Sequence, residues 1–401
     1  MIIHQRVKNF ETLGLGMFVH FGIYSLLQRG EWIRDFEKMP KEEYESLHLR
    51  FNPKPTWAKE LAAAAKDAGC RYITLTSRHH DGYSLYDTCG LSDFDSVHSC
   101  GRDLIREFVD ACREEGLIPF FYHTLLDWHM DTFNSDFPGY LAYLRESVKL
   151  LCTNYGPIGG LWFDGTWSKP GADWEEDALY ATIRRYQPEA IIVNNTGMDS
   201  RGALGNIELD SVTFERGKPQ PMNLEDSPRY IASEMCEVMN NHWGFADLDL
   251  GYLSTGDVIG NLADCRRYRA NFLLNVGPMP DGGLRLIDRG ILEILGKWVR
   301  LNEEAIRQPA PTGITVEGRE DDFILRKDNT LYLFVRKPSL CNTTELRPER
   351  FPLAETVTSA CWLDNGEELS FTQEDGTVTV FTTPHRYGFN LCTRVVKLKL
   401  A

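Results

Sequence analysis

Short apolar runs recur along residues 1–276, and each is followed by a stretch with polar and helix-forming residues. The runs are rich in β-branched and aromatic side chains, which is typical of strands buried on both faces of a parallel sheet. They span residues 17–21, 72–76, 117–122, 158–163, 190–194, 207–212 and 271–276. This rhythm predicts a series of strand and helix units, and therefore an α/β fold.

The segments between the runs carry helix start and stop signals. Residues 55–68 begin with a proline and are followed by Gly69, and residues 102–115 are followed by Gly116. Seven or eight such units in about 300 residues match a (β/α)8-like barrel better than a doubly wound sheet. A dinucleotide-binding sheet would also need GxGxxG after the first strand, where this chain has HFGIYS at residues 20–25.

The pattern changes at residues 308–313, QPAPTG. The prolines and the glycine of this segment are typical of a domain boundary. Beyond it, short alternating segments separated by turns predict a small antiparallel β-sandwich. We therefore expect a catalytic barrel over residues 1–308 and a C-terminal sandwich over residues 309–401. The expected sandwich strands include residues 323–326, 330–335, 377–382 and 395–400.

Composition narrows the class of partner. The chain has 58 acidic and 43 basic residues, a net charge of −15, and no basic run, which argues against a nucleic-acid partner. It has no window of 18 apolar residues, and the apolar stretch near residue 1 is only two residues long, where a secretory signal needs at least seven. We therefore expect no membrane partner and a cytoplasmic location, or a secreted one if a signal has been removed. The ten cysteines form no CxxC motif and are expected to be reduced thiols.

Polar residues follow several of the predicted strands, at the end where active sites of such barrels form. His20 follows the first strand, residues 78–82 (RHHDG) the second, and Tyr122 closes the third. Asp164 follows the apolar run Leu-Trp-Phe and precedes a glycine. A carboxylate in such surroundings suits a nucleophile or a base, although a cap of the next helix is the alternative.

Cleavage of a glycosidic bond needs a second carboxylate. Glu215 stands out because it follows a strand and has the apolar Phe214 beside it, which would raise its pKa. The alternative is that Glu215 is a solvated surface residue. The other candidates are Glu208, Asp210, Glu225, Glu234 and Glu237.

Four tryptophans lie in predicted loops or strand ends, where indole rings could stack on the apolar face of a sugar. Packing in the core is the alternative for each. They are Trp32, Trp128, Trp162 and Trp243.

The histidines near the predicted strand ends could alternatively be the metal ligands of a metal-dependent hydrolase. His20, His79 and His80 could supply imidazoles, and Asp81 or Asp164 a carboxylate. The H-x-H pattern expected on a first strand is absent because residue 18 is Phe, and adjacent residues 79 and 80 would point to opposite sides of an extended backbone. We therefore expect neither a metal nor a cofactor.

Taken together, these motifs resemble those of the α-L-fucosidases of glycoside hydrolase family 29. The resemblance runs from about Phe10 to Arg307. The motifs, in family order, are GMFVHFG at 16–22, GEWI at 30–33, KDAGCRY at 66–72, HHDG at 79–82, LWFDG at 161–165, and NFLLNVGP at 271–278 with Asp281-Gly282.

The resemblance implies a retaining exo-hydrolase that removes terminal α-L-fucosyl residues through a covalent fucosyl-enzyme intermediate. Asp164 matches the family nucleophile and Glu215 the acid/base, with Glu234 in reserve. The aromatic residues Phe18 and Trp243 would line the pocket for the C6 methyl group. The residues expected to hold the sugar hydroxyls are His20, Glu31, Trp32, His79, His80, Tyr122 and Trp162.

Two departures from the family pattern touch the sugar pocket. Relatives often carry an Arg soon after the Asn that ends the fifth strand, whereas this chain has NNTG at 194–197, with Arg201 the nearest candidate. The usual Tyr-Tyr-Ser after the third strand is replaced by FYH at 121–123.

The implied partner is a fucosylated oligosaccharide or glycoconjugate, of a linkage that the sequence leaves open, and a homo-oligomer is also left open. One alternative is an α-L-galactosidase or a related activity, since an apolar pocket rejects one added hydroxyl weakly. The other is an inactive carbohydrate-binding protein, which would predict loss of the carboxylate at position 164.

Overall fold

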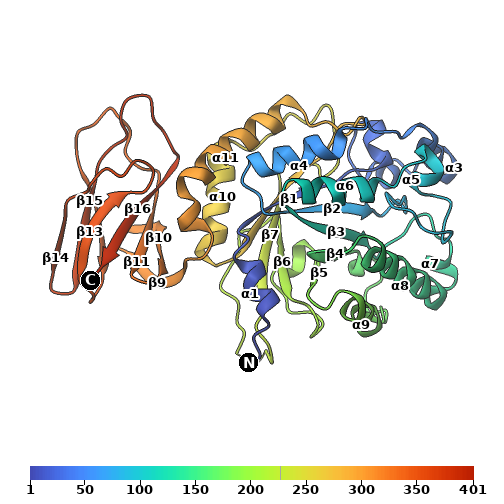
Figure 1. Cartoon of the computed structure of the whole chain (residues 1–401), viewed down its shortest axis with the longest axis horizontal. Coiled ribbons are helices and arrows are strands. Elements are labelled where there is room, and N and C mark those ends of the chain that lie inside the picture. Colours follow the sequence, from blue (N-terminus) through green and yellow to red (C-terminus); the bar gives the residue numbers. More distant parts are fainter. Residues whose placement is uncertain (226) are drawn as a thin grey trace. The chain divides into compact units, whose positions relative to one another are not determined.

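The computed structural model describes residues 1–225 and 227–401, and eight parallel strands in sequence order close into a barrel (Figure 1). Each strand pairs with the next, and β8 pairs back to β1. The barrel strands are β1 Leu15–Val19, β2 Tyr72–Arg78, β3 Ile118–Thr124, β4 Gly160–Asp164, β5 Ile191–Asn194, β6 Ser211–Glu215, β7 Ala232–Val238 and β8 Asn271–Val276.

The predicted barrel is thus confirmed, most strand limits differ by one or two residues from the predicted runs, and two differences are larger. The run expected at 207–212 begins too early, because β6 covers Ser211–Glu215, so that Glu215 is the last residue of a strand instead of a loop residue. Strand β7 was not expected at all. Its sequence, ASEMCEV, places Ser233 and Glu234 inside a buried strand, so it lacks the continuous apolar run that marks the others.

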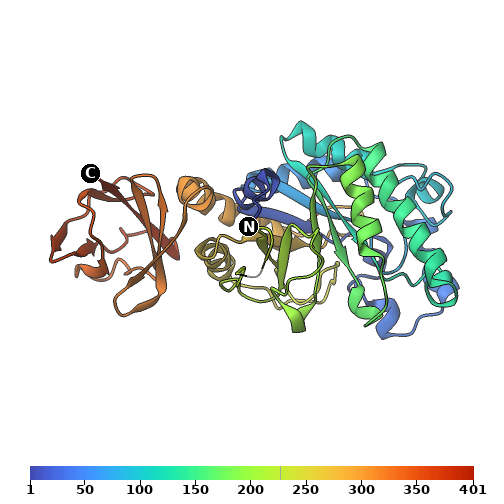
Figure 2. The ribbon, with the colours of Figure 1, turned by 90° about the horizontal axis from the view of Figure 1, so that it is seen from below.

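Helices flank the strands and carry recognisable caps. Asp103 caps the start of α6 by accepting a hydrogen bond from the Arg106 amide at 2.9 Å, and Asp136 caps α8. Helices α8 and α9 pack side by side (Figures 1 and 2). The helices before residue 254 are α1 Gln5–Glu11, α2 Ile33–Phe36, α3 Lys41–Glu45, α4 Trp57–Asp67, α5 Ser96–Cys100, α6 Leu104–Glu114, α7 Thr132–Ser135, α8 Phe137–Asn154 and α9 Glu176–Tyr186.

Large side chains fill the interior of the barrel. Phe18, Tyr72, Phe120 and Trp162 are each at most 3% exposed and belong to one cluster of buried residues. This packing makes the barrel a core and not a pore, and it confines any open space to the two ends.

The chain divides into two compact units, one of residues 1–253 and 271–293 and the other of residues 254–270 and 294–401. The predicted limit between residues 308 and 309 stays a prediction. The second unit contains α10 Thr255–Arg267 and most of α11 Leu286–Ile306. Among the described helices, none has both the length and the apolar character that a membrane span requires.

The C-terminal strands form two antiparallel sheets around a shared core that includes Leu333, Trp362 and Val380. One sheet has the order β13-β16-β11-β10-β9 and the other the order β12-β15-β14. The strands are β9 Ala310–Val316, β10 Arg319–Lys327, β11 Thr330–Arg336, β12 Arg347–Pro352, β13 Val357–Trp362, β14 Phe371–Glu374, β15 Thr377–Thr382 and β16 Thr393–Leu400.

Candidate active site

Asp164 is the last residue of β4 and lies at the carboxyl end of the barrel, with 15% of its side chain exposed. The chain turns sharply after it, because Gly165 has φ +113° and an added Cβ there would meet the Leu126 amide nitrogen at 2.7 Å. The glycine after the carboxylate is therefore required by the turn. It lets the 3₁₀ helix η3, Thr166–Ser168, fold back over the end of β4.

Three side chains from separate elements surround the Asp164 carboxylate. The Tyr122 hydroxyl donates to Oδ2 at 3.0 Å, His80 Nε2 lies 3.4 Å from Oδ2, and Trp167 Nε1 donates to Oδ1 at 3.1 Å. Burial by itself raises the pKa of Asp164, but His80, Trp167 and Tyr122 outweigh it, so that the pKa lies below its ordinary value. Asp164 is therefore held as a carboxylate.

Glu215, at the end of β6, faces the same space. The Asn195 amide nitrogen donates to Glu215 Oε2 at 2.8 Å and to Asp164 Oδ1 at 3.3 Å. Because one nitrogen reaches both, these two oxygens are at most about 6 Å apart, close to the separation of about 5–5.5 Å in retaining glycosidases and below the 6.5–9.5 Å of inverting ones. The geometry leaves too little room for a water molecule to attack from the opposite face.

The pKa values of the two carboxyl groups are driven apart. Burial raises the pKa of Glu215, and the negative charge of Asp164 raises it further, against the lowering effect of the Asn195 hydrogen bond. One group is therefore suited to stay ionised while the other holds a proton. This is the division of labour that a nucleophile and a general acid require.

Asn195 is itself fixed in orientation. Its side-chain oxygen accepts hydrogen bonds from the Thr213 hydroxyl at 2.9 Å and from the Gly197 amide at 3.2 Å. With the oxygen occupied in this way, the amide nitrogen is turned towards the two carboxylates.

Aromatic rings form the floor of the site. The ring of Phe18 lies 5.0 Å from that of Trp162, 5.8 Å from that of Trp243 and 4.6 Å from that of His20, between ring centres. Asn275 links two of these walls, since its oxygen accepts from His20 Nδ1 at 2.7 Å and its nitrogen donates to the Trp243 carbonyl at 2.7 Å. The result is an apolar surface with a polar group at its edge.

The remaining predicted residues line the same end of the barrel. His79 stacks on Tyr122 at 5.6 Å, and Trp32 meets His80 edge to face at 5.2 Å. Glu31 is buried and accepts a hydrogen bond from the Gly244 amide at 2.7 Å. All eleven residues predicted from the sequence thus lie near one another at this end of the barrel, and their roles stay predictions.

The buried histidines are poor bases in this setting. Burial lowers the pKa of His20 to about 3 and the pKa of His79 well below its ordinary value. Both rings are therefore neutral, and each can donate through one nitrogen and accept through the other. Among the described residues there is no group of three or more His, Cys, Asp or Glu side chains arranged to hold a metal ion.

Glu234, the reserve candidate for the second carboxylate, lies elsewhere. It is the third residue of β7 and accepts hydrogen bonds inside the barrel from the Tyr72 hydroxyl and, at 3.0 Å, from Trp162 Nε1. Its strand partner is Thr213, two residues before Glu215 on β6. The structure therefore places Glu234 deeper in the barrel than Glu215, which favours Glu215 over Glu234 as the candidate acid/base.

Two residues that contact the carboxylates were not predicted as site residues. Asn195 belongs to the NNTG stretch that was read only as a departure from the family pattern. Trp167, whose indole nitrogen donates to Asp164, was passed over although it follows Asp164 by only three positions. The signal for Trp167 was an exposed aromatic beside a turn glycine, and no local signal marks Asn195.

Comparison with known proteins gives one consistent result. A family model described as alpha-L-fucosidase matches residues 3–304. Tissue alpha-L-fucosidase from Bos taurus is 27% identical over 340 residues, covering 77% of this chain and 70% of the relative. Among solved structures, alpha-L-fucosidase isoenzyme 1 from Paenibacillus thiaminolyticus is 30% identical with a TM-score of 0.85, covering 99% of both chains.

A second solved structure is informative about chemistry in a relative. An alpha-L-fucosidase of family GH29 from Bacteroides thetaiotaomicron, solved as a trapped covalent intermediate with 2-fluoro-fucosyl fluoride, shares the fold at 22% identity and a TM-score of 0.83. The match covers 99% of this chain and 96% of that one.

Proposed function

The chain belongs to the alpha-L-fucosidase family, GH29, whose members are retaining glycoside hydrolases, and from this premise we propose that Asp164 and Glu215 are its nucleophile and its acid/base. The observation that carries the assignment is the bridge that Asn195 makes between the two carboxyl groups. It supports a pair at the retaining separation, with pKa values shifted in opposite directions.

In the first step, the Asp164 carboxylate attacks C1 of a terminal α-L-fucosyl residue. Glu215 gives its proton to the glycosidic oxygen as the bond to the leaving group breaks. The lowered pKa of Asp164 keeps the attacking oxygen ionised, and the raised pKa of Glu215 lets that group hold its proton to a higher pH than an ordinary glutamate does. The products of this step are the free leaving group and a fucosyl ester of Asp164.

In the second step, Glu215 is a carboxylate and takes a proton from a water molecule, whose oxygen attacks C1. The ester bond to Asp164 breaks, and fucose leaves with its original anomeric configuration. Asn195 contacts both carboxyl groups. Its side-chain N–H can therefore donate a hydrogen bond to Asp164 or to Glu215, whichever of them carries the negative charge at that step.

Recognition of the sugar is assigned to the surrounding walls. The rings of Phe18 and Trp243 offer an apolar surface suited to the C6 methyl group of fucose. The neutral imidazoles of His20 and His79 can share hydroxyl protons as donors and acceptors. The substrate we propose is therefore a terminal fucosyl residue of an oligosaccharide or glycoconjugate.

Proton NMR of the sugar released in the first minutes of hydrolysis tests this function. We expect an aryl α-L-fucoside to be cleaved and α-L-fucose to be the first anomer observed. Initial release of β-L-fucose would contradict the retaining pair. Absence of fucose release from the aryl fucoside and from branched and unbranched fucosylated oligosaccharides, in folded protein, would contradict the substrate.

A further inference from the structure

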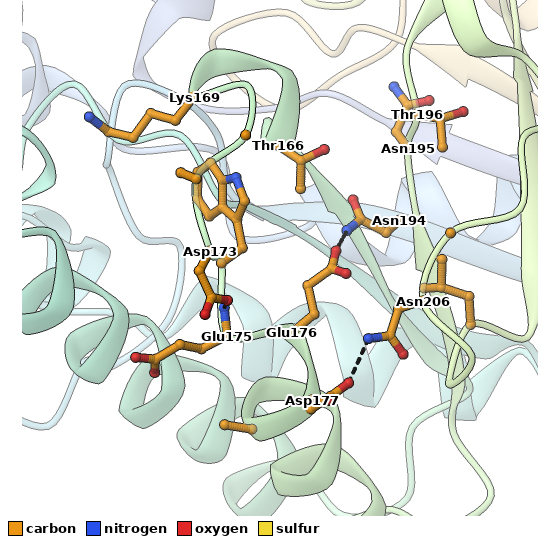
Figure 3. A pocket seen from close by; sticks show the side chains of 16 residues that line it. Thr166, Lys169, Asp173, Glu175, Glu176, Asp177, Asn194, Asn195, Thr196 and Asn206 are labelled. Carbon is orange, nitrogen blue, oxygen red and sulfur yellow. Dashed lines mark hydrogen bonds between the residues drawn. The ribbon is translucent and has the colours of Figure 1, made fainter.

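A second polar cavity, of about 640 Å³, lies behind the wall that carries the catalytic carboxylates (Figure 3). It lies between the end of β5, the turn η3 and the first turn of α9, and we call it the α9 pocket. Thr166, two residues after Asp164, and Asn195, which contacts both carboxyl groups, belong to its lining. The α9 pocket and the catalytic centre therefore share a wall.

Two buried polar atoms in the lining lack a hydrogen-bond partner among the described residues. Asn194 is 5% exposed, and its nitrogen uses both hydrogens, donating to Glu176 Oε1 and to the Tyr180 hydroxyl at 2.9 Å each. Its oxygen has no partner and points away from Glu176, as Figure 3 shows. Trp174, 8% exposed, likewise has no acceptor for its indole N–H.

These two atoms specify complementary chemistry. The Asn194 oxygen needs a donor and the Trp174 N–H needs an acceptor, and hydroxyl or acetamido groups of a sugar offer both kinds of partner. A buried polar atom without a partner in the protein is satisfied by water or by a bound molecule, and here two such atoms belong to the lining of one cavity.

The charges of the lining disfavour an anionic ligand. It contains four carboxylates and one ammonium group, that of Lys169, so an anionic ligand would be repelled. The carboxylates are already engaged: Glu176 with Asn194, and Asp177 with Asn206 at 2.7 Å (Figure 3). Of the other two, Glu175 forms an ion pair with Arg145, and Asp173 accepts from a backbone amide at 2.9 Å.

We propose that the α9 pocket is a second saccharide site, which binds a neutral sugar unit through its hydroxyl or acetamido groups. Its volume lies within the range of about 300–1,000 Å³ that is typical of small-molecule sites. The proposal rests on the proposed function in one respect, the expectation that this enzyme meets glycans. The sugar is either a unit of the substrate glycan beyond the fucose or a separate saccharide.

Two variants probe the pocket without touching the catalytic residues. Trp174→Phe removes the indole N–H and keeps an aromatic ring against Phe137, which lies 5.1 Å away between ring centres. Ala178→Tyr fills the pocket from an exposed position of α9 and removes no hydrogen bond. Ala181→Tyr is the matched control, since it adds the same side chain to an exposed position of the same helix that is not part of the lining.

The kinetic arm compares a 4-nitrophenyl α-L-fucoside with a neutral fucosylated oligosaccharide. If the pocket binds a unit of the substrate, Trp174→Phe lowers kcat/KM on the oligosaccharide roughly three- to tenfold, the effect of one lost hydrogen bond, and leaves the aryl fucoside unchanged. Ala178→Tyr lowers it at least as much, and Ala181→Tyr has no effect. If the aryl fucoside is not cleaved at all, the proposed function fails, and the binding arm still tests the pocket.

The binding arm uses calorimetry with free N-acetyllactosamine on enzyme whose fucose pocket is saturated with an iminocyclitol inhibitor. If a separate saccharide is the ligand, saturable binding is seen, Ala178→Tyr abolishes it, and a 6-sulfated disaccharide binds about tenfold more weakly. Saturable binding that both variants leave unchanged would overturn the proposal. So would the absence of binding together with unchanged kcat/KM on the oligosaccharide in both folded variants.

Discussion

The mouth of the barrel and its interior both hold buried carboxyl groups, and their surroundings differ in one respect. At the mouth, Asp164 and Glu215 face each other, and the ionisable ring of His80 lies beside one of them. In the interior, Glu234 accepts hydrogen bonds from the neutral donors Tyr72 and Trp162, and burial raises its pKa to about 7.

This difference separates the two carboxyl groups that we propose as catalytic from the one that we interpret as structural. Burial raises the pKa in both regions, so burial alone does not identify a catalytic residue. What distinguishes the mouth is a pair of groups whose pKa values are shifted in opposite directions. His80, Trp167 and Tyr122 lower the pKa of Asp164, whereas burial and the charge of Asp164 raise the pKa of Glu215. Each prediction below tests this difference, starting with the largest expected effect.

Replacing Asp164 by Gly should lower kcat/KM on an aryl fucoside by at least about 10⁴-fold, because the covalent route is lost. Added azide should restore turnover by attacking C1 from the vacated side, and the product should be β-L-fucosyl azide, identified by NMR. Activity within tenfold of wild type, or formation of α-L-fucosyl azide, would contradict the assignment of Asp164 as the nucleophile.

Replacing Glu215 by Gln should lower kcat/KM by roughly 10²–10⁴-fold on fucosylated oligosaccharides, whose poor leaving groups need a proton, and by less on aryl fucosides. In the wild type, activity should fall at alkaline pH as Glu215 loses its proton. Because the pKa of Glu215 is raised, this fall should begin at a higher pH than the pKa of an ordinary glutamate would give. The variant should lack this alkaline limb. A retained limb would show that another group is the acid.

Replacing Asn195 by Ala should lower kcat roughly tenfold and move the alkaline limb to higher pH. The sign follows because the Asn195 hydrogen bond lowers the pKa of Glu215, so its loss raises that pKa further. Thr213→Val, which removes only the hydroxyl that orients Asn195, is the matched variant and should shift the limb less. A shift to lower pH in the Asn195 variant would contradict the bridge.

Of the four replaced residues, Glu234 should matter least for activity, and Glu234→Gln should change kcat/KM on the aryl fucoside by less than about tenfold. Its main effect should be on the free energy of unfolding. A carboxyl group with a raised pKa in the folded state stabilises most fully below its unfolded pKa. That contribution, up to about 3 kcal/mol, is lost as pH rises through about 7.

Thermal unfolding of wild type and variant between pH 4.5 and 8 checks this prediction. The midpoint of the wild type should fall as pH rises, and that of Glu234→Gln should fall less. If the unfolding midpoints of the two proteins change in parallel with pH, Glu234 does not titrate in this range. If Glu234→Gln loses as much activity as Glu215→Gln, the proposed difference between the carboxyl groups of the mouth and of the interior is contradicted.

The sequence was sufficient where a residue's role follows from its own segment. Asp164 could be predicted because an apolar run ends at it and a glycine follows, which is the pattern of a strand end. Strand β7 could not be predicted, because the polar Glu234 is buried only through donors on β2 and β4.

The position of Asn195 in the site could not be predicted for a related reason. Its importance depends on Thr213, Asp164 and Glu215, which lie on two other strands. Local patterns predicted the barrel and pointed to the two carboxyl groups that we propose as the catalytic pair, whereas contacts between distant strands decide which neighbouring polar residues touch them.

The most direct test of the central claim is to identify the residue that carries the covalent intermediate. Wild-type protein is treated with 2-fluoro-fucosyl fluoride, the intact mass is measured, and the label is mapped by peptide sequencing in the mass spectrometer. The account predicts a single 2-fluoro-fucosyl group on the Asp164 carboxylate. A label on Glu215, Glu234 or any other residue would contradict it.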